Sequence, residues 1–378
     1  MSVRPTVCHV TSVHVSNDGR ILYHECRSLA TRYRTLLLVR DDGPDRVAEG
    51  VEIRTLPKTR SRLERFVANG RLLRAAMATE ADLFHFHDPE LLPAMATLAQ
   101  ATAKPVVYDA HEDYPAAMTQ KSWIPRSLRP LASSLADRTE RRNVPRLSAV
   151  VVADEALERR FNAMHPRVVR LDNYPPLSLF GSPRPTLQGP PTMLYVGSVS
   201  KVRGFLDMIE VLELVRASVP GARLVVYGRP TEEVTAMLPG LRGRFPEGAL
   251  EMRGPLPYGE LPAALAEAHL GLSLLRPHPK YEHNVSMKVF DYMAAGVPWV
   301  ASDFAPLRSG TDNGTGGELV PPGDPAAAAR AILGLLADRP RAESLGRAGR
   351  ALVEARLNWE SVEPKLFGLY EQLLRVDS

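Results

Sequence analysis

The sequence predicts an α/β protein made of two Rossmann-like, doubly wound domains that face each other across a cleft. Three observations predict this fold class. The chain has 378 residues, which is more than one hydrophobic core usually supports. Short apolar runs bounded by turn residues alternate with helical patterns, as in β-α-β units, and this series occurs twice. Between the two series, residues 173–191 are rich in proline and glycine and lack any helical or strand period.

Each series predicts its own parallel sheet. The expected strands of the first are 6–11, 34–39, 51–55, 83–87, 105–109 and 149–153, with helices between them, for example at 22–31 and 62–78. The expected strands of the second are 193–197, 223–227, 250–254, 270–274 and 297–302, and its helices include 205–217, 259–268, 287–295, 325–337 and 341–356. We therefore expect one domain over residues 1–175, a linker over 176–190 and a second domain over 191–359.

The composition is that of a folded, soluble protein, with 44% hydrophobic and 24% charged residues. Apolar runs such as 149–153 are far shorter than the roughly 20 residues that cross a bilayer. The N-terminus lacks the apolar region of a signal peptide, which favours a cytoplasmic location. The two cysteines, Cys8 and Cys26, are expected to be small buried hydrophobes rather than a disulfide or a metal site.

Basic residues gather in two segments although the net charge is only +4. Residues 54–74 and residues 121–146 each hold seven Lys or Arg, against one and two acidic residues. Such a segment is either a solvated helix face or a patch that docks on anionic lipid, so a peripheral contact with the inner face of a membrane stays open. Neither segment interleaves aromatic residues with its charges, which argues against nucleic acid as a partner.

Ligands of open parallel sheets bind beyond the carboxyl ends of the strands, so the loops after the strands are the candidate sites. The first loop, residues 14–20, offers His14, Asp18, Gly19 and Arg20 at the start of a helix. Backbone amides there suit an anion, and Arg20 is a candidate fork for phosphate or carboxylate. An ordinary capped turn is the alternative reading of this loop.

Two later loops place histidine beside carboxylate. His85, His87 and Asp88 end one strand, and His111 and Glu112 follow the next. A metal is one interpretation, but no third set of ligands is evident, and we expect none. Hydrogen bonding to ligand hydroxyls is the other interpretation. A satisfied core position is expected for His85 and not for His111.

The strand ends of the second domain carry glycines and cations. Gly197 and Ser198 lead into Arg203 at a helix start, where a diphosphate would be neutralised. Tight turns at Gly228–Arg229 and Gly254–Pro255 would let a nucleobase approach the backbone.

The strongest candidate site is the helix entrance over residues 284–291. Free amides at Asn284, Val285, Ser286 and Met287 suit a phosphate, and Lys288 adds a point charge. Asp291, on an adjacent face of the helix, would accept hydrogen bonds from the two ribose hydroxyls. A surface ion pair on an amphipathic helix is the alternative, but the pair stands at the mouth of a parallel sheet.

At this point the chain resembles the retaining family 4 glycosyltransferases of GT-B architecture. The segments that carry the resemblance are LYVGSVSKVRG, VVYGRP, MKVFDYMAAGVPWVASD and GGELVPPGDPAAAARAI, with FHFHDPELL, VVYDAHEDY and LDNYPP in the first half. Ser198 stands where the family usually has arginine, and Asp291 is shorter than the usual glutamate. By position, Arg203 and Lys288 match the cations that hold the donor diphosphate, Asp291 the acid on the ribose, and His111 the histidine on the transferring sugar.

The resemblance implies transfer of a sugar from a nucleoside-diphosphate sugar to an acceptor hydroxyl or amine, with retention and without a metal or other cofactor. Candidate acceptor-binding residues are His14, Asp18, Gly19, Arg20, His87, Asp88 and Glu112. It also implies a C-terminal helix, residues 360–378, that completes the first domain. The acceptor is either a small molecule or a lipid-linked one, and the donor base, the sugar and the oligomeric state are left open. A nucleotide-sugar 2-epimerase and a non-catalytic sugar-nucleotide-binding protein remain alternatives.

Overall fold

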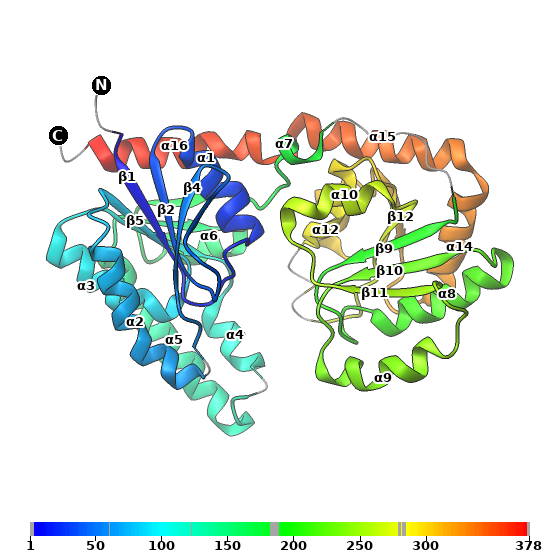
Figure 1. The fold of residues 1–378 in the computed structure, drawn as a ribbon, viewed down its shortest axis with the longest axis horizontal. Helices are drawn as coiled ribbons and strands as arrows, with labels where there is room; N and C mark the ends of the chain where they lie inside the picture. Colours follow the sequence, from blue (N-terminus) through cyan, green and yellow to red (C-terminus); the bar gives the residue numbers. More distant parts are fainter. Residues whose placement is uncertain are drawn as a thin grey trace. The chain divides into compact units, whose positions relative to one another are not determined.

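The computed structural model describes residues 4–59, 61–121, 123–181, 189–278, 281 and 285–375. The chain divides into two compact units. Unit 1 comprises Met1–Asn173 and Trp359–Ser378, and unit 2 comprises Tyr174–Asn358. Each unit is built on one largely parallel sheet packed with helices, so the predicted class of two doubly wound α/β domains is confirmed (Figure 1).

The sheet of unit 1 has the strand order β3-β4-β2-β1-β5-β6-β7-β8. Its strands are β1 (Thr6–Val10), β2 (Arg34–Arg40), β3 (Arg46–Ala48), β4 (Val51–Leu56), β5 (Leu83–Phe86), β6 (Val106–Ala110), β7 (Ala149–Val152) and β8 (Val168–Arg170). All pairs are parallel except β3 with β4. The six predicted strands are confirmed. The two that sequence reasoning missed, β3 and β8, are short edge strands whose residues are at best half-buried, so they lack the apolar run that marks a central strand.

The helices of unit 1 are the π-helix η1 (Gly19–Cys26) with α1 (Arg27–Ala30), α2 (Arg62–Met77), α3 (Leu92–Thr102), α4 (Tyr114–Gln120), α5 (Arg129–Asn143), α6 (Glu155–Asn162) and α16 (Trp359–Arg375). The helix predicted over 22–31 therefore begins earlier and is wound as a π-helix at first. Asp18 caps it by accepting from the amides of Arg20 and Ile21. Such wide turns occur often at functional sites. α16 packs against η1 and β8 of the same unit.

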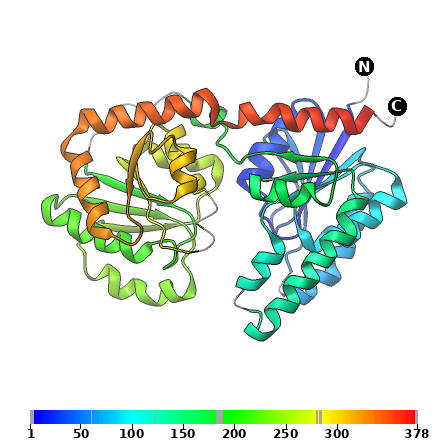
Figure 2. The ribbon, with the colours of Figure 1, turned by 180° about the vertical axis from the view of Figure 1, so that it is seen from behind.

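Unit 2 has the strand order β11-β10-β9-β12-β13-β14, with all pairs parallel. Figure 2 shows the ribbon from behind. The strands are β9 (Thr192–Val196), β10 (Arg223–Tyr227), β11 (Leu250–Gly254), β12 (Leu270–Ser273), β13 (Trp299–Ser302) and β14 (Gly317–Val320). The helices are α7 (Leu177–Phe180), α8 (Phe205–Ser218), α9 (Glu232–Arg242), α10 (Leu261–Ala266), α12 (Met287–Ala294), α13 (Ala305–Gly310), α14 (Pro325–Ala337) and α15 (Arg339–Arg356).

The five predicted strands of unit 2 are confirmed, and β14, a half-buried edge strand, was missed. The stretch expected as a linker contains the short helix α7, whose Phe180 is buried in unit 2. Residues 182–188 of that stretch lie outside the described residues. Cys8 and Cys26 are buried free thiols, as expected. Within the described part of the chain, every helix is too short or too polar to cross a membrane.

Candidate functional site

In unit 2, two cations converge on the backbone at the end of β9. A Cβ built on Gly197 would lie 3.6 Å from Cε of Lys288 and 3.7 Å from Nη1 of Arg203. Lys288 comes from α12 and Arg203 from the turn before α8, so three segments far apart in sequence meet at one carboxyl end of the sheet. Two cations beside bare backbone are what a diphosphate requires.

Glycines allow this close approach. Gly228 has φ +154°, and a Cβ there would stand 1.8 Å from the carbonyl oxygen of Gly197. Gly204 has φ +73°, and its Cβ would stand 1.5 Å from the carbonyl oxygen of Leu274. No other residue fits either position without moving backbone. Gly228 therefore lets the loops after β9 and β10 approach each other, and Gly204 lets the turn before α8 approach the end of β12.

Lys288 lies in the first turn of α12, whose N-cap is Ser286. Its Nζ lies 3.4 Å from Oγ of Ser286, which in turn is 2.8 Å from Oγ of Ser273. The ammonium also stands 5.3 Å from the ring centroid of Tyr195. Burial, together with the charge of Arg203, lowers the pKa of Lys288 to about 7. Among the residues that the structure describes, Lys288 forms no ion pair with a carboxylate, so its ammonium is available to an anionic ligand.

Asp291 is one turn further along the same helix. Its Oδ1 accepts a hydrogen bond of 2.9 Å from the hydroxyl of Tyr258. Burial raises the pKa of Asp291 to about 7, against the opposing effects of Tyr258 and Lys288. Sequence reasoning missed Tyr258 and Tyr195. Tyr195 lies near the end of β9, and Tyr258 follows β11. Nothing in the local sequence indicates that either side chain contacts a residue far away in the chain.

The other predicted donor-binding residues lie in the same group of loops. The amide of Gly228 donates to the carbonyl of Gly254 at 2.6 Å, and the amide of Val199 donates to the carbonyl of Arg229 at 3.0 Å. The side chains of Ser198, Arg229 and Pro255 are exposed, whereas Val285 and Met287 are half-buried. Asn284, predicted as part of the phosphate cradle, lies outside the described residues.

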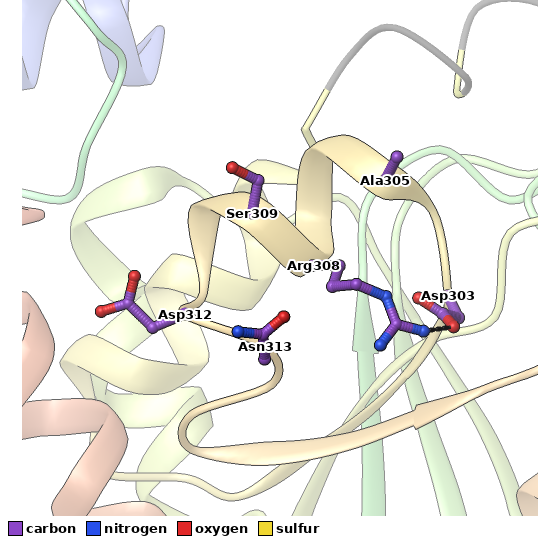
Figure 3. A pocket seen from close by; sticks show the side chains of 6 residues that line it. All are labelled: Asp303, Ala305, Arg308, Ser309, Asp312 and Asn313. Carbon is purple, nitrogen blue, oxygen red and sulfur yellow. Dashed lines mark hydrogen bonds and ion pairs between the residues drawn. The ribbon is translucent and has the colours of Figure 1, made fainter.

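An open pocket of about 560 Å³ lies beyond β13, at the carboxyl end of the same sheet (Figure 3). It is lined by Asp303, Ala305, Arg308, Ser309, Asp312 and Asn313. In this pocket the guanidinium of Arg308 is paired with Asp303, and the carboxylate of Asp312 is paired with Arg356 at 2.5 Å. Because these charges neutralise one another, the pocket offers an anion less than the Lys288 and Arg203 pair does.

In unit 1, Asp88 organises the loop after β1 instead of facing a ligand. Its Oδ2 accepts from the hydroxyl of Thr11 at 2.8 Å and from the amide of Ser12 at 2.6 Å. The residue is 3% exposed. The prediction that Asp88 binds an acceptor is therefore wrong for its side chain, since the carboxylate is used to hold the protein's own loop.

The prediction that Arg20 binds phosphate or an acceptor is also corrected by the structure. Its Nε and Nη2 donate to the two carboxylate oxygens of Asp109, each at 2.9 Å, and Nη1 donates to the carbonyl of Leu171 at 2.9 Å. Its Nε also lies 3.2 Å from Glu25. The guanidinium is buried, so Arg20 is an internal fork for Asp109 and is not free to bind phosphate or an acceptor.

The prediction that His87 binds an acceptor is the third one that the structure corrects. It is 2% exposed and bonded through both nitrogens, with Nε2 3.0 Å from Nδ1 of His9 and Nδ1 3.1 Å from Oδ2 of Asp109. Burial lowers the pKa of His87 to about 4, so the ring is neutral. His85 is buried and bonded to the hydroxyl of Tyr370 at 2.8 Å, as expected for a core residue.

The accessible part of this cluster is formed by His14 and His111, whose ring centroids are 4.8 Å apart. Nε2 of His111 lies 2.8 Å from Oδ2 of Asp109. His14 lies 3.1 Å from Asp18, and although burial opposes it, this partner and Asp88 raise the pKa of His14 to about 9. Gly19 begins η1 behind them. Glu112 is exposed and lies 3.7 Å from Lys121.

Four potential metal ligands, Glu25, His85, His87 and Asp109, come within 4.8 Å of one another in the core of unit 1. The Arg20 guanidinium already stands beside both carboxylates. A second cation there would be repelled by it and would have to displace the hydrogen bonds of His87. The geometry therefore favours a network of ion pairs and hydrogen bonds over a metal centre.

Both halves of the chain match family models. Residues 19–176 match the glycosyl transferase 4-like domain, and residues 190–338 match the model described as glycosyl transferases group 1. Over 322 residues the chain is 26% identical to a phosphatidyl-myo-inositol mannosyltransferase of Mycolicibacterium smegmatis, covering 83% of this chain and 75% of that protein. A glycogen synthase of Mycobacterium tuberculosis is 28% identical over 183 residues, which are 48% of this chain and 42% of the relative.

Solved structures share the fold at lower identity. The chain is similar to a sucrose-phosphate synthase of Thermosynechococcus elongatus, with a TM-score of 0.74, 21% identity, and coverage of 99% of this chain and 100% of that one. HepE of Anabaena, solved in complex with UDP-glucose, gives a TM-score of 0.70 at 15% identity, with coverage of 98% and 100%. These likenesses identify the fold as that of the GT-B structures.

Proposed function

The chain belongs to the group 1 glycosyltransferases with a family 4-like N-terminal domain, and from this premise we propose that Gly197, Arg203 and Lys288 form the donor diphosphate site. As a member of this family the protein is a retaining glycosyltransferase that takes its sugar from a nucleotide-sugar donor. This membership favours transfer over the alternatives of a 2-epimerase and a non-catalytic binding protein. The single observation that carries the proposed site is the convergence of the two cations on Gly197.

The proposed chemistry is electrostatic. Negative charge grows on the diphosphate as the bond to the sugar breaks, and Arg203, Lys288 and the amides that begin α12 stabilise it there. The acceptor attacks on the side that the diphosphate leaves, and its proton passes to the departing phosphate. These cations do the work that a divalent metal does in other enzymes, so the proposed reaction needs none.

Asp291 and His111 complete the proposed assignment. The carboxylate of Asp291, held by Tyr258, accepts hydrogen bonds from the ribose of the donor. His111, an accessible histidine of its cluster, is the proposed residue that contacts the transferring sugar. The loop around His14, Asp18 and Gly19 remains the proposed acceptor region. The side chains of Arg20, His87 and Asp88 bond to other groups of the protein and stabilise the structure around this loop.

A panel of UDP-, GDP- and dTDP-sugars tests the proposed function. The purified protein is expected to release nucleoside diphosphate from one of them, faster with a suitable acceptor, and with the product keeping the anomeric configuration of the donor. Chelation of divalent metal is expected to leave the rate unchanged. Release without any acceptor, together with an isomerised sugar, would contradict transfer and support the epimerase.

We propose further that the acceptor is lipid-linked and that the protein docks on the inner face of a membrane through residues 121–146. The mannosyltransferase relative carries a phosphatidyl-inositol in its name, and this segment has both the charge and the apolar surface for an anionic bilayer. Leu131 and Leu135 are exposed four residues apart, so they share one face of α5, and the exposed Leu128 and Trp123 precede the helix.

The same face of α5 continues into Arg138 and Arg142, at the same spacing and both exposed. Among the residues that the structure describes, neither of these arginines forms an ion pair. The other basic segment is less suitable, since Arg54, Lys58 and Arg65 lie within 3.7 Å of Glu52, Asp42 and Glu90. Arg60 lies outside the described residues.

Vesicle binding is expected to depend on this face. The protein should sediment with phosphatidylcholine vesicles that contain phosphatidylglycerol, less so at high salt, and not with phosphatidylcholine alone. Leu131→Asp and Leu135→Asp should each weaken binding on the order of tenfold, because each removes an apolar side chain from the bilayer interface. Val47→Asp, at an exposed valine of β3, is the matched control and should bind normally. Equal binding of all variants would overturn the docking face and leave the transferase function standing.

A further inference from the structure

A continuous row of hydrogen-bonded side chains runs through the core of unit 1, from α16 to the loop after β6. Nδ1 of His85 meets the hydroxyl of Tyr370 at 2.8 Å, and that hydroxyl meets Nε2 of His9 at 3.1 Å. Nδ1 of His9 meets Nε2 of His87 at 3.0 Å, and Nδ1 of His87 meets Oδ2 of Asp109 at 3.1 Å. The same oxygen lies 2.8 Å from Nε2 of His111.

The ionised carboxylate of Asp109 determines which atom donates and which accepts in each hydrogen bond of this row. Burial alone would raise the pKa of Asp109, but the bidentate Arg20 and the bonds from His111 and His87 outweigh it and hold that pKa well below its usual range. The other acid beside Arg20, Glu25, has its pKa raised by burial and by Asp109, so the positive charge of Arg20 is balanced by Asp109.

An ionised carboxylate only accepts hydrogen bonds, so His87 must donate through Nδ1 and His111 through Nε2. Burial keeps the rings of His87 and His9 neutral. A neutral His87 then accepts at Nε2, His9 donates to it through Nδ1, and Tyr370 donates to His9. Every tautomer in the row follows from the one negative charge on Asp109.

From this geometry we infer that Asp109 is the positioning residue of His111, fixing the imidazole with Nε2–H on the carboxylate and leaving the Nδ1 lone pair for the ligand. The inference rests on the proposed function, in which His111 contacts the transferring sugar. His111 is the most accessible member of the row, with its side chain 20% exposed, whereas that of Asp109 is fully buried. Among the described residues, Nδ1 of His111 has no hydrogen-bond partner.

The surroundings of Asp109 explain how it can hold His111 rigidly. Both of its oxygens accept from Arg20, and the Nδ1 of His87 stands 3.2 Å from Nε2 of His111, both directed at Oδ2. On its open side His111 faces the ring of His14, which is paired with Asp18. A fixed Nδ1 acceptor selects a ligand group that donates, which suits a sugar hydroxyl and not a phosphate oxygen.

The tautomer of His111 tests the inference without any substitution. Nitrogen-15 NMR of the full-length, unliganded protein should show Nε2 of His111 protonated and Nδ1 unprotonated. Finding the proton on Nδ1 would overturn the inference. In Asp109→Asn the amide should present both a donor and an acceptor, so His111 should lose its single tautomer. His165, which is bonded to backbone groups of the same unit, should keep its signals as the internal control.

A double-mutant cycle separates positioning from general support of the fold. Asp109→Asn is expected to lower kcat about 100-fold with little change in KM for the donor. The reason is that a misplaced His111 loses its contact with the transferring sugar mainly in the transition state. The double variant with His111→Ala should be no slower than His111→Ala alone. Additive losses would contradict positioning. If His111→Ala keeps full activity, the proposed role of His111 fails, and the tautomer measurement alone decides whether Asp109 fixes the ring.

Discussion

Replacing Lys288 by alanine is expected to lower kcat about 10²–10³-fold, the loss typical when one donor that stabilises a developing oxyanion is removed. The side chain stands beside Gly197 and Arg203 in a half-buried position, so alanine removes one of the two cations of the proposed site. Lys201→Ala is the matched control, because Lys201 lies in the same loop region but its side chain is 42% exposed and paired with Glu233 at 2.5 Å. An unchanged kcat in Lys288→Ala would contradict the proposed diphosphate site.

A proton measurement gives the same prediction a second readout. The pKa of Lys288 is about 7 without ligand, so at about pH 8 the amine is mostly neutral. A bound diphosphate favours the charged form and raises this pKa, so binding should take up roughly one proton near pH 8, and donor affinity should fall as the pH rises further. Calorimetric titration in two buffers of different ionisation enthalpy measures the uptake. Lys288→Ala should show none.

Replacing Arg20 by methionine is expected to lower the free energy of unfolding by about 3–5 kcal/mol, because it leaves the buried charge of Asp109 without its partner. Arg34→Met is the matched control. Arg34 also forms a bidentate pair, with Glu52 at 2.7 and 2.9 Å, but this pair is exposed and should contribute less than about 1 kcal/mol. Urea denaturation of both variants measures the difference. Similar losses in the two would show that burial does not set the cost.

The central strands could be predicted because their residues are buried on both faces. β7 is an unbroken apolar run, and β2 contains one over residues 36–39; such runs are typical of parallel sheets. β3, β8 and β14 could not, since an edge strand is stabilised by its ladder to one neighbour and needs no apolar run. The π-helical winding of η1 was also not predicted from the sequence.

The candidate site was predictable where topology alone decides it. The carboxyl-end rule for parallel strands puts Gly197, Arg203 and Lys288 at one edge of the sheet, and the structure brings them together. The rule says nothing about burial. Arg20 and His87 meet Asp109 across 89 and 22 residues, and only those contacts reveal that both side chains serve the protein and not a ligand. Tyr258 was missed for the same reason, since its partner Asp291 is 33 residues away.

The return of α16 to unit 1 determines the order in which the two units can finish folding on the ribosome. Its Trp359 donates to Ser28 at 2.8 Å, its Phe367 packs under Arg32, and its Tyr370 bonds to His9. Unit 2 therefore has all of its residues before unit 1 does, although the sheet of unit 1 is synthesised first. Until α16 emerges, the nascent first half carries an uncovered apolar surface and an incomplete histidine row, and transiently exposed apolar surface of this kind favours aggregation.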